Sequence, residues 1–262
     1  MNSTGRTFKE DELDAFVSLS PLTQGDTGRI DVLPAFGSAS ARQPENILPK
    51  IARAMTEQVD GEGEVVAMGP RLSSMIARFT ARGSYDVVLI DSRAGLAELA
   101  APAVLSLGAL VLLFGTAQNQ TITGFGALFA GLKLLATRSI LMGGDADWRL
   151  MFKPVYAKAS LDPVTAERYR ADIYDLFAEN LYDQVEDLST EGDSFNFSID
   201  DLDAPHEPLI IPFDSRFVDF DPAVTQSQLT RSFYEQTFRP FLDGLDKALD
   251  WMSEIANAPS DT

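Results

Sequence analysis

Asp91, Ser92, Arg93 and Gly95 follow an apolar run, and their types and spacing could do chemistry. The run, residues 87–90, reads Val-Val-Leu-Ile, which predicts a strand buried on both faces of a parallel sheet. An acid at the carboxyl end of such a strand lies where open α/β sheets bind their ligands, and there it can help to hold the Mg²⁺ of a phosphoryl-transfer site. The spacing alone leaves an alternative open, in which Asp91 only caps the next helix.

A longer motif surrounds these residues. Residues 85–96, Y-D-V-V-L-I-D-S-R-A-G-L, resemble the Walker B and switch II segment of the ParA/MinD family of deviant-Walker P-loop ATPases. The similarity is greatest to the branch that writes this segment hhhhD-[ST]-R-[TA]-G, where h is apolar. In outline the resemblance extends from Ile30 to Leu249, but only the central motif is specific.

The resemblance implies a function and a role for each motif residue. In that family two protomers enclose ATP and Mg²⁺, and hydrolysis switches a dimer that positions cargo or regulates partner enzymes. Asp91 would hold the Mg²⁺ through water and take part in catalysis. Ser92, Arg93 and Gly95 would form the switch that senses the γ-phosphate.

The order of elements along the chain predicts the fold. We expect one α/β domain over residues 1–262, a three-layer, doubly wound, mostly parallel sheet flanked by helices, without the family's usual first strand and P-loop. Strands are predicted at residues 30–35, 87–90, 109–114, 150–156 and 208–212. Helices are predicted at residues 46–59, 65–82, 96–107, 122–137, 162–182 and 226–255.

Two late segments gain roles from the resemblance. It places base or phosphate contacts after the strand at residues 150–156, where this chain has Lys158. It places Pro212 and Phe213 in a segment near the adenine pocket. The helix at residues 122–137 is rich in small residues, so it is either a dimer face or a helix packed closely on the sheet.

The phosphate-binding half of such a site is missing from the sequence. A P-loop reads G-x-x-x-x-G-K-[ST], because backbone N–H groups and the Lys together neutralise phosphate charge. None of the six lysines follows a Gly and precedes Ser or Thr, and the glycine clusters at residues 25–28 and 61–63 contain acids. Three explanations stay open: an ATP site assembled without a P-loop, a partner that supplies one, or a reading frame that begins upstream of Met1.

Charge and composition exclude several other classes of function. A net charge of −18 argues against broad electrostatic binding of DNA, RNA or anionic lipid. Arg71, Arg78 and Arg82 share a helix face and form either a local basic patch or ordinary solvated side chains. The absence of cysteine excludes disulfides and thiolate metal sites and suits the reducing cytoplasm. The single histidine, His206, excludes a histidine-cluster metal site and is predicted in a loop.

Two further expectations concern partners. The longest apolar stretch, residues 99–115, is broken by Pro102, Ser106 and Gly108, so no membrane span is predicted. Residues 184–208 are rich in acids and aromatics and are predicted to be an insertion, either a partner-docking segment or a partly ordered loop. The protein is therefore expected to act as a homodimer or with a partner protein. The alternative to an ATPase is a non-catalytic interaction module, and a hydrolase with paired carboxylates has no motif in its favour.

Overall fold

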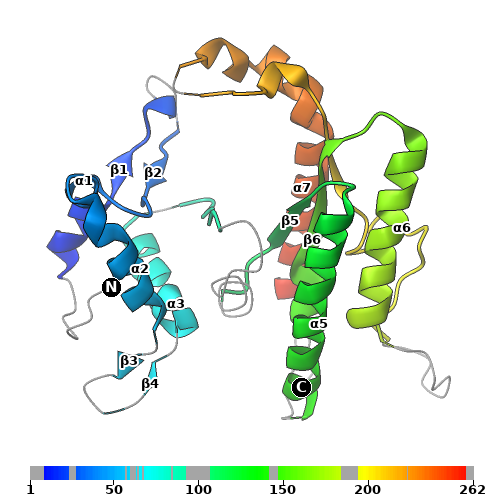
Figure 1. Cartoon of the computed structure of the whole chain (residues 1–262), viewed down its shortest axis with the longest axis horizontal. Helices are drawn as coiled ribbons and strands as arrows, with labels where there is room; N and C mark the ends of the chain where they lie inside the picture. The colour runs from blue at the N-terminus through cyan, green and yellow to red at the C-terminus, as the bar shows by residue number, and fades with distance from the viewer. Residues whose placement is uncertain are drawn as a thin grey trace. The chain divides into compact units, whose positions relative to one another are not determined.

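The computed structural model covers the whole chain and describes residues 9–23, 28–56, 58–59, 63, 65–66, 68–83, 85–92, 107–141, 147–183, 194–222 and 224–257. The chain divides into two compact units, Met1–Leu107 and Gly108–Thr262. Each is described by itself below, and Figure 1 shows the elements of both.

The second unit is built on a parallel sheet. Strands β5 (Val111–Gly115), β6 (Phe152–Ala159) and β7 (Leu209–Pro212) are hydrogen-bonded in the order β5-β6-β7. Helix α5 (Asn119–Leu141) joins β5 to β6, and α6 (Pro163–Asn180) joins β6 to β7. The last three strands predicted from the sequence are confirmed, and so is the coarse α/β class.

The residues of β5 show which helices cover each face of the sheet. A Cβ at Gly115 would lie 2.5 Å from the Thr121 side chain of α5, so Gly115 faces that helix. Its neighbour Phe114 has its ring centroid 6.1 Å from that of Phe241, in α7 (Arg231–Asn257). Successive strand residues point to opposite faces. Helices α5 and α6, which contact each other, therefore cover one face and α7 covers the other (Figure 1).

Aromatic residues fill the α5–α6 side of the sheet. Phe129 of α5 is fully buried and meets Phe152 of β6 and Phe177 of α6 edge-on, with centroids 6.3 and 5.0 Å away. Tyr156 of β6 stacks on Tyr169 of α6 at 4.3 Å. Because β6 is sandwiched between β5 and β7, its side chains are among the most buried of the described residues.

Local sequence signals explain how α6 and α7 are formed. Helix α6 begins at Pro163, directly after Asp162, whose carboxylate accepts a hydrogen bond from the Thr165 N–H at 3.1 Å. Proline suits the first position of a helix because its nitrogen carries no hydrogen to satisfy. Helix α7 continues through Pro240. Gly244 lets it approach β7 closely, since a Cβ there would lie 2.6 Å from Leu209.

Short elements connect these helices and strands. They are η4 (Asp147–Met151), η5 (Ser215–Phe217) and η6 (Gln226–Leu229). Segment 194–208 contains turns but no helix or strand.

The first unit consists of short elements. In chain order they are η1 (Glu10–Phe16), β1 (Ser18–Leu19), η2 (Pro21–Thr23), β2 (Asp31–Val32), α1 (Ser38–Ala41), η3 (Pro44–Asn46), α2 (Ile47–Met55), β3 (Gln58–Val59), β4 (Val65–Val66) and α3 (Met68–Thr80). Strands β1 and β2 pair antiparallel, as do β3 and β4. The strand predicted at residues 30–35 is thus two residues long and belongs to a hairpin-like pair. The helix predicted at residues 46–59 ends earlier, as α2.

The predicted strand at residues 87–90 is wrong. Described residues 85–92 form neither helix nor strand, and Val87, Val88, Leu89 and Ile90 are 44–88% exposed. A run of apolar side chains is buried only where strands pair with it and helices cover it, and within the described residues no strand pairs with this one. The helix predicted at residues 96–107 lies almost wholly outside the described residues.

No described helix combines the length and the apolar character needed to cross a membrane.

Candidate functional site at the carboxyl edge of the sheet

The carboxyl ends of β5, β6 and β7 lie at one edge of the sheet because the three strands are parallel. We call this the carboxyl edge. It comprises the loop from Thr116 to Gln118, the end of β6 with the residues after it, from Lys158 to Asp162, and the segment from Phe213 to Arg216. Open α/β sheets bind ligands in this position, so its side chains are the first candidates for a site.

The loop after β5 is held by hydrogen bonds to the start of α5. The Gln118 carbonyl accepts from the N–H of Thr121 at 2.9 Å and of Ile122 at 3.3 Å. The hydroxyls of Thr116 and Thr121 lie 3.3 Å apart. Arg168 of α6 donates to the Ala117 carbonyl at 3.3 Å, which links the loop after β5 to α6.

The end of β6 holds a lysine in an unusual conformation. Lys158 has φ 54, in the left-handed region, and the β6–β7 register shifts between Ala157 and Ala159. A bulge of this kind redirects a side chain out of the strand's alternation. The Lys158 side chain is exposed, and within the described residues its ammonium belongs to no ion pair. Next to it, the Ser160 N–H donates to the Tyr156 hydroxyl at 3.2 Å.

The segment after β7 lies directly beside this lysine. The Phe213 N–H donates to the Ala159 carbonyl at 3.0 Å, so the backbones of the two ends are joined. Phe213 is 55% exposed, and Leu161 and Val164, on the β6 side, are 87% and 72% exposed. The carboxyl edge thus combines an exposed lysine with apolar side chains that face solvent.

Asp214 is fully engaged and is not available as a general base or metal ligand. It accepts from the Arg216 guanidinium at 2.5 Å and from the Thr237 hydroxyl of α7 at 2.5 Å. The bonds from Arg216, then that from Thr237, hold the pKa of Asp214 well below its usual range. Arg216 also lies over the Phe233 ring at 4.5 Å and donates to the Gln236 side chain at 3.1 Å. This network fastens the segment after Phe213 to α7.

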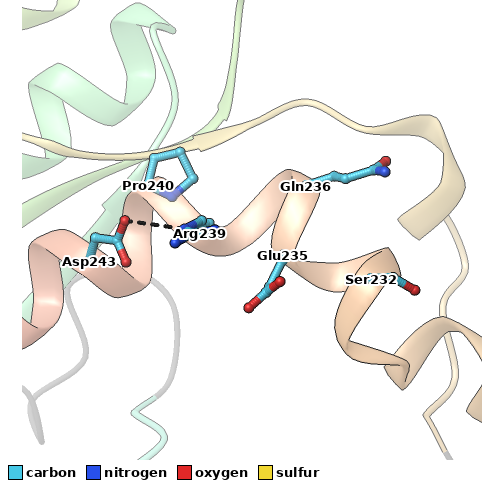
Figure 2. A pocket seen from close by; sticks show the side chains of 6 residues that line it. All are labelled: Ser232, Glu235, Gln236, Arg239, Pro240 and Asp243. Carbon is cyan, nitrogen blue, oxygen red and sulfur yellow. Dashed lines mark ion pairs between the residues drawn. The ribbon is translucent and has the colours of Figure 1, made fainter.

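A surface hollow of about 580 Å³ lies on α7 itself. It is lined by Ser232, Glu235, Gln236, Arg239, Pro240 and Asp243 (Figure 2). All six belong to one helix, and the Arg239–Asp243 pair, at 3.7 Å, is exposed. A hollow on one helix encloses no ligand, because ligand sites are clefts walled on several sides.

The residues predicted from the sequence fall into three groups. Lys158, Pro212 and Phe213 are brought together at the carboxyl edge. Asp91 and Ser92 belong to the first unit and are exposed. Arg93 and Gly95 lie outside the described residues. Their predicted roles, and that of Asp91, stay predictions.

Sequence reasoning missed the residues that shape this edge. The Asp214–Arg216–Thr237 network had one local signal, an aspartate two residues before an arginine at a strand end. The buried Tyr156–Tyr169 stack had none. The Tyr169 hydroxyl is buried without a hydrogen-bond partner in the described part of the chain, and burial raises the pKa of Tyr169 above its usual value.

The small residues of α5 support the packing alternative at one position. A Cβ at Gly126 would lie 3.4 Å from Leu176 of α6, so this glycine faces a neighbouring helix of its own chain. Gly124 and Gly131 face open space, and a dimer face there stays a prediction.

Two further observations concern metal ligands and related proteins. The described residues contain no cluster of three or more His, Asp or Glu side chains able to hold a metal ion. No family model, curated protein or solved structure matches the chain.

Proposed function

We propose that this chain is a nucleotide-linked switch module of the ParA/MinD type, in which the carboxyl edge of the β5–β6–β7 sheet contributes to an ATP site. The observation that carries the proposal is the meeting of Lys158 and Phe213 at the ends of two adjacent parallel strands. A flat base can stack on an exposed aromatic ring, and an ammonium can neutralise a phosphate oxygen.

The donors at this edge fit a nucleotide better than they fit Mg²⁺. Asp162 is occupied with the Thr165 amide and hydroxyl, and Asp214 with Arg216 and Thr237. Mg²⁺ prefers free carboxylate and water oxygens. The resemblance alone keeps Asp91, in the first unit, as the proposed ligand of Mg²⁺, through water, with Ser92, Arg93 and Gly95 as the proposed switch.

The proposal includes a supplier for the missing phosphate loop. One lysine leaves most of the charge of a triphosphate uncompensated. A partner protein, or a second copy of this chain in a homodimer, would supply further donors, and binding by the isolated chain would be weak.

Calorimetric titration with ATP, with and without Mg²⁺, tests the proposal. We expect binding by the native chain that Lys158→Gln and Phe213→Ala each weaken about tenfold, the usual effect of losing one good contact. Lys247→Gln is the matched control, since Lys247 is an exposed lysine of α7. Asp91→Ala should weaken binding only when Mg²⁺ is present. No heat up to millimolar ATP would refute an ATP site in the isolated chain.

A non-catalytic interaction module is the second candidate. Leu161 and Val164, largely exposed beside Phe213, favour it, because clustered exposed apolar side chains mark protein contacts. Sedimentation equilibrium tests self-association at this edge. A dimer that Leu161→Glu dissociates and Leu48→Glu does not would support this candidate, since Leu48 is a comparably exposed leucine of α2. A monomer at every concentration would exclude self-association there.

A further inference from the structure

The single histidine of the chain is buried in the second unit, in a closed set of contacts that neither candidate function uses. His206 is fully buried, and its Nδ1 lies 2.5 Å from the Tyr182 hydroxyl. Its Nε2 lies 3.5 Å from the Ile199 carbonyl. Its ring meets those of Tyr174 and Phe177 of α6 nearly edge-on, with centroids 5.0 and 6.4 Å away. Buried neutral imidazole accepts at one nitrogen and donates at the other, which suits these two partners.

His206 lies near one end of a segment, residues 194–208, that we call the strap. At its first end, the Phe195 N–H donates to the Asp183 carboxylate at 2.8 Å, and the Asp183 N–H donates to the Phe195 carbonyl at 2.9 Å. Arg149 pairs with Asp183 at 2.7 Å and lies over the Phe195 ring at 4.3 Å.

The second end of the strap is attached to β6 and α6. The Lys153 ammonium donates to the Ala204 carbonyl at 2.8 Å, and Arg170 of α6 pairs with Glu207 at 2.5 Å. The Tyr182–His206 bond lies at this end. Apolar contacts hold the strap as well, since the rings of Phe195 and Phe197 pack against Tyr182 with centroids 5.5 and 5.4 Å away.

Positive charge surrounds the imidazole from two elements. The charges of Lys153 in β6 and Arg170 in α6 act on the ring. Tyr174 and Tyr182 pack their rings against it, and Asp201, Asp203 and Glu207 belong to the strap itself. Burial lowers the pKa of His206. The Ile199 carbonyl and Asp201 act in the opposite direction, and the charges of Lys153 and Arg170 lower the pKa further.

We propose that the strap is an acid-sensitive latch, in which protonation of His206 places a charge in this buried site and releases residues 194–208 from α6. A proton on Nδ1 turns that nitrogen from an acceptor into a donor, so the Tyr182 hydroxyl must reverse its role in the bond, and a charged ring is then buried. The released strap uncovers Phe177 and Tyr182, which are buried when it is closed.

The direction of the pH effect follows from linkage. A released His206 takes up a proton near its ordinary pKa of about 6.5, whereas the buried ring resists it. The closed strap is therefore stable above about pH 6.5. Below this pH, the equilibrium constant for closing falls about tenfold per pH unit, until the buried ring also titrates. Lys153, whose pKa burial lowers to about 8, keeps its charge throughout this window.

Nuclear magnetic resonance of the native chain tests the latch, because its only histidine gives one set of imidazole signals. The first measurement is the titration of His206 between pH 5 and 8. The second is the protection against hydrogen exchange of the Asp201, Ala204 and Glu207 amides, which donate to backbone carbonyls of the strap. We expect these protection factors, corrected for intrinsic exchange, to fall about tenfold per pH unit below about pH 6.5.

Two variants separate a latch from a merely structural histidine. His206→Gln keeps an acceptor for Tyr182 and cannot titrate, so protection of the strap should become independent of pH. Tyr174→Phe keeps the ring packed on His206 and removes a hydroxyl that does not bond to it, so the pH response should stay as in the native chain. A free titration of His206 near pH 6.5 with constant protection, or the same acid response in His206→Gln, would overturn the proposal.

Discussion

Residues 87–90 and strand β5 are both short runs of branched apolar residues, yet their surroundings are opposite. In β5, Leu113 is 9% exposed, because β6 pairs alongside and α5 and α6 cover its face. In the other run, Leu89 is 88% exposed, and no described strand pairs with it. The difference teaches that the burial of a strand is a property of its neighbours, which the run itself does not encode.

The largest expected effect comes from trimming one leucine in each run. Leu113→Ala should lower the free energy of unfolding of the second unit by roughly 2–5 kcal/mol, since it removes buried methyl groups and leaves a cavity. Leu89→Ala should change stability by less than about 0.5 kcal/mol. Urea unfolding followed by circular dichroism measures both. Equal losses of stability in the two variants would show that residues 87–90 are buried in solution, and would contradict the difference in burial between the two runs.

Adding a methyl group tests how tightly β5 packs on α5. Gly115→Ala places a Cβ 2.5 Å from Thr121 and 2.8 Å from Phe125, so we expect a loss of roughly 1–3 kcal/mol in unfolding free energy. Gly131→Ala adds the same group inside α5, where nothing lies within 4 Å, and should stabilise the helix by up to about 1 kcal/mol. Tryptophan fluorescence reports on this unit, which contains both Trp148 and Trp251.

The buried Lys153 and the exposed Lys50 should differ in how they make stability depend on pH. Burial lowers the pKa of Lys153 to about 8, so between pH 8 and 10 the unfolded chain binds more protons than the folded one. Stability should therefore rise with pH over this window, by up to about 2 kcal/mol.

Tyrosines limit this gain at higher pH. The raised pKa values of Tyr169 and Tyr182 oppose it above about pH 10, where the unfolded phenols ionise first. Thermal unfolding at several pH values measures the effect. Lys153→Met should flatten the profile, whereas Lys50→Met, at an exposed lysine of α2, should leave it unchanged. A native profile that is flat from pH 8 to 10 would contradict the burial of Lys153.

The smallest effect concerns the first turns of two helices. Asp162 accepts a hydrogen bond from the Thr165 N–H at the start of α6, whereas Asn46, at the start of α2, makes no such bond. Asp162→Ala should lower the exchange protection of the Thr165 amide, and Asn46→Ala should leave α2 unchanged. The Thr165 bond lowers the pKa of Asp162, so this protection is present at neutral pH and is lost as the carboxylate protonates in acid.

Sequence reasoning succeeded where local chemistry and tertiary structure agree. The Asp162-Pro163 pair predicted where α6 begins, and the apolar runs at β5, β6 and β7 predicted three strands that the sheet then buries. It failed at residues 87–90, because burial there depends on neighbours. The left-handed conformation of Lys158 follows from the register shift between β6 and β7, which no single strand reveals. Phe213 and Lys158 were both singled out, but only the sheet order shows that they are adjacent.

Pro240 divides the hydrogen-bond ladder of α7 without ending the helix. Proline has no N–H, so the carbonyl of Gln236, four residues earlier, lacks its helical donor, and this gap lies beside the hollow in Figure 2. On the amino side of the gap, Thr237 is bonded to Asp214 at the carboxyl edge. On the other side, Phe241 and Gly244 lie against β5 and β7. The gap therefore separates the turns that are bonded to the carboxyl edge from the turns that pack on the sheet, and we expect the first set to open without the second.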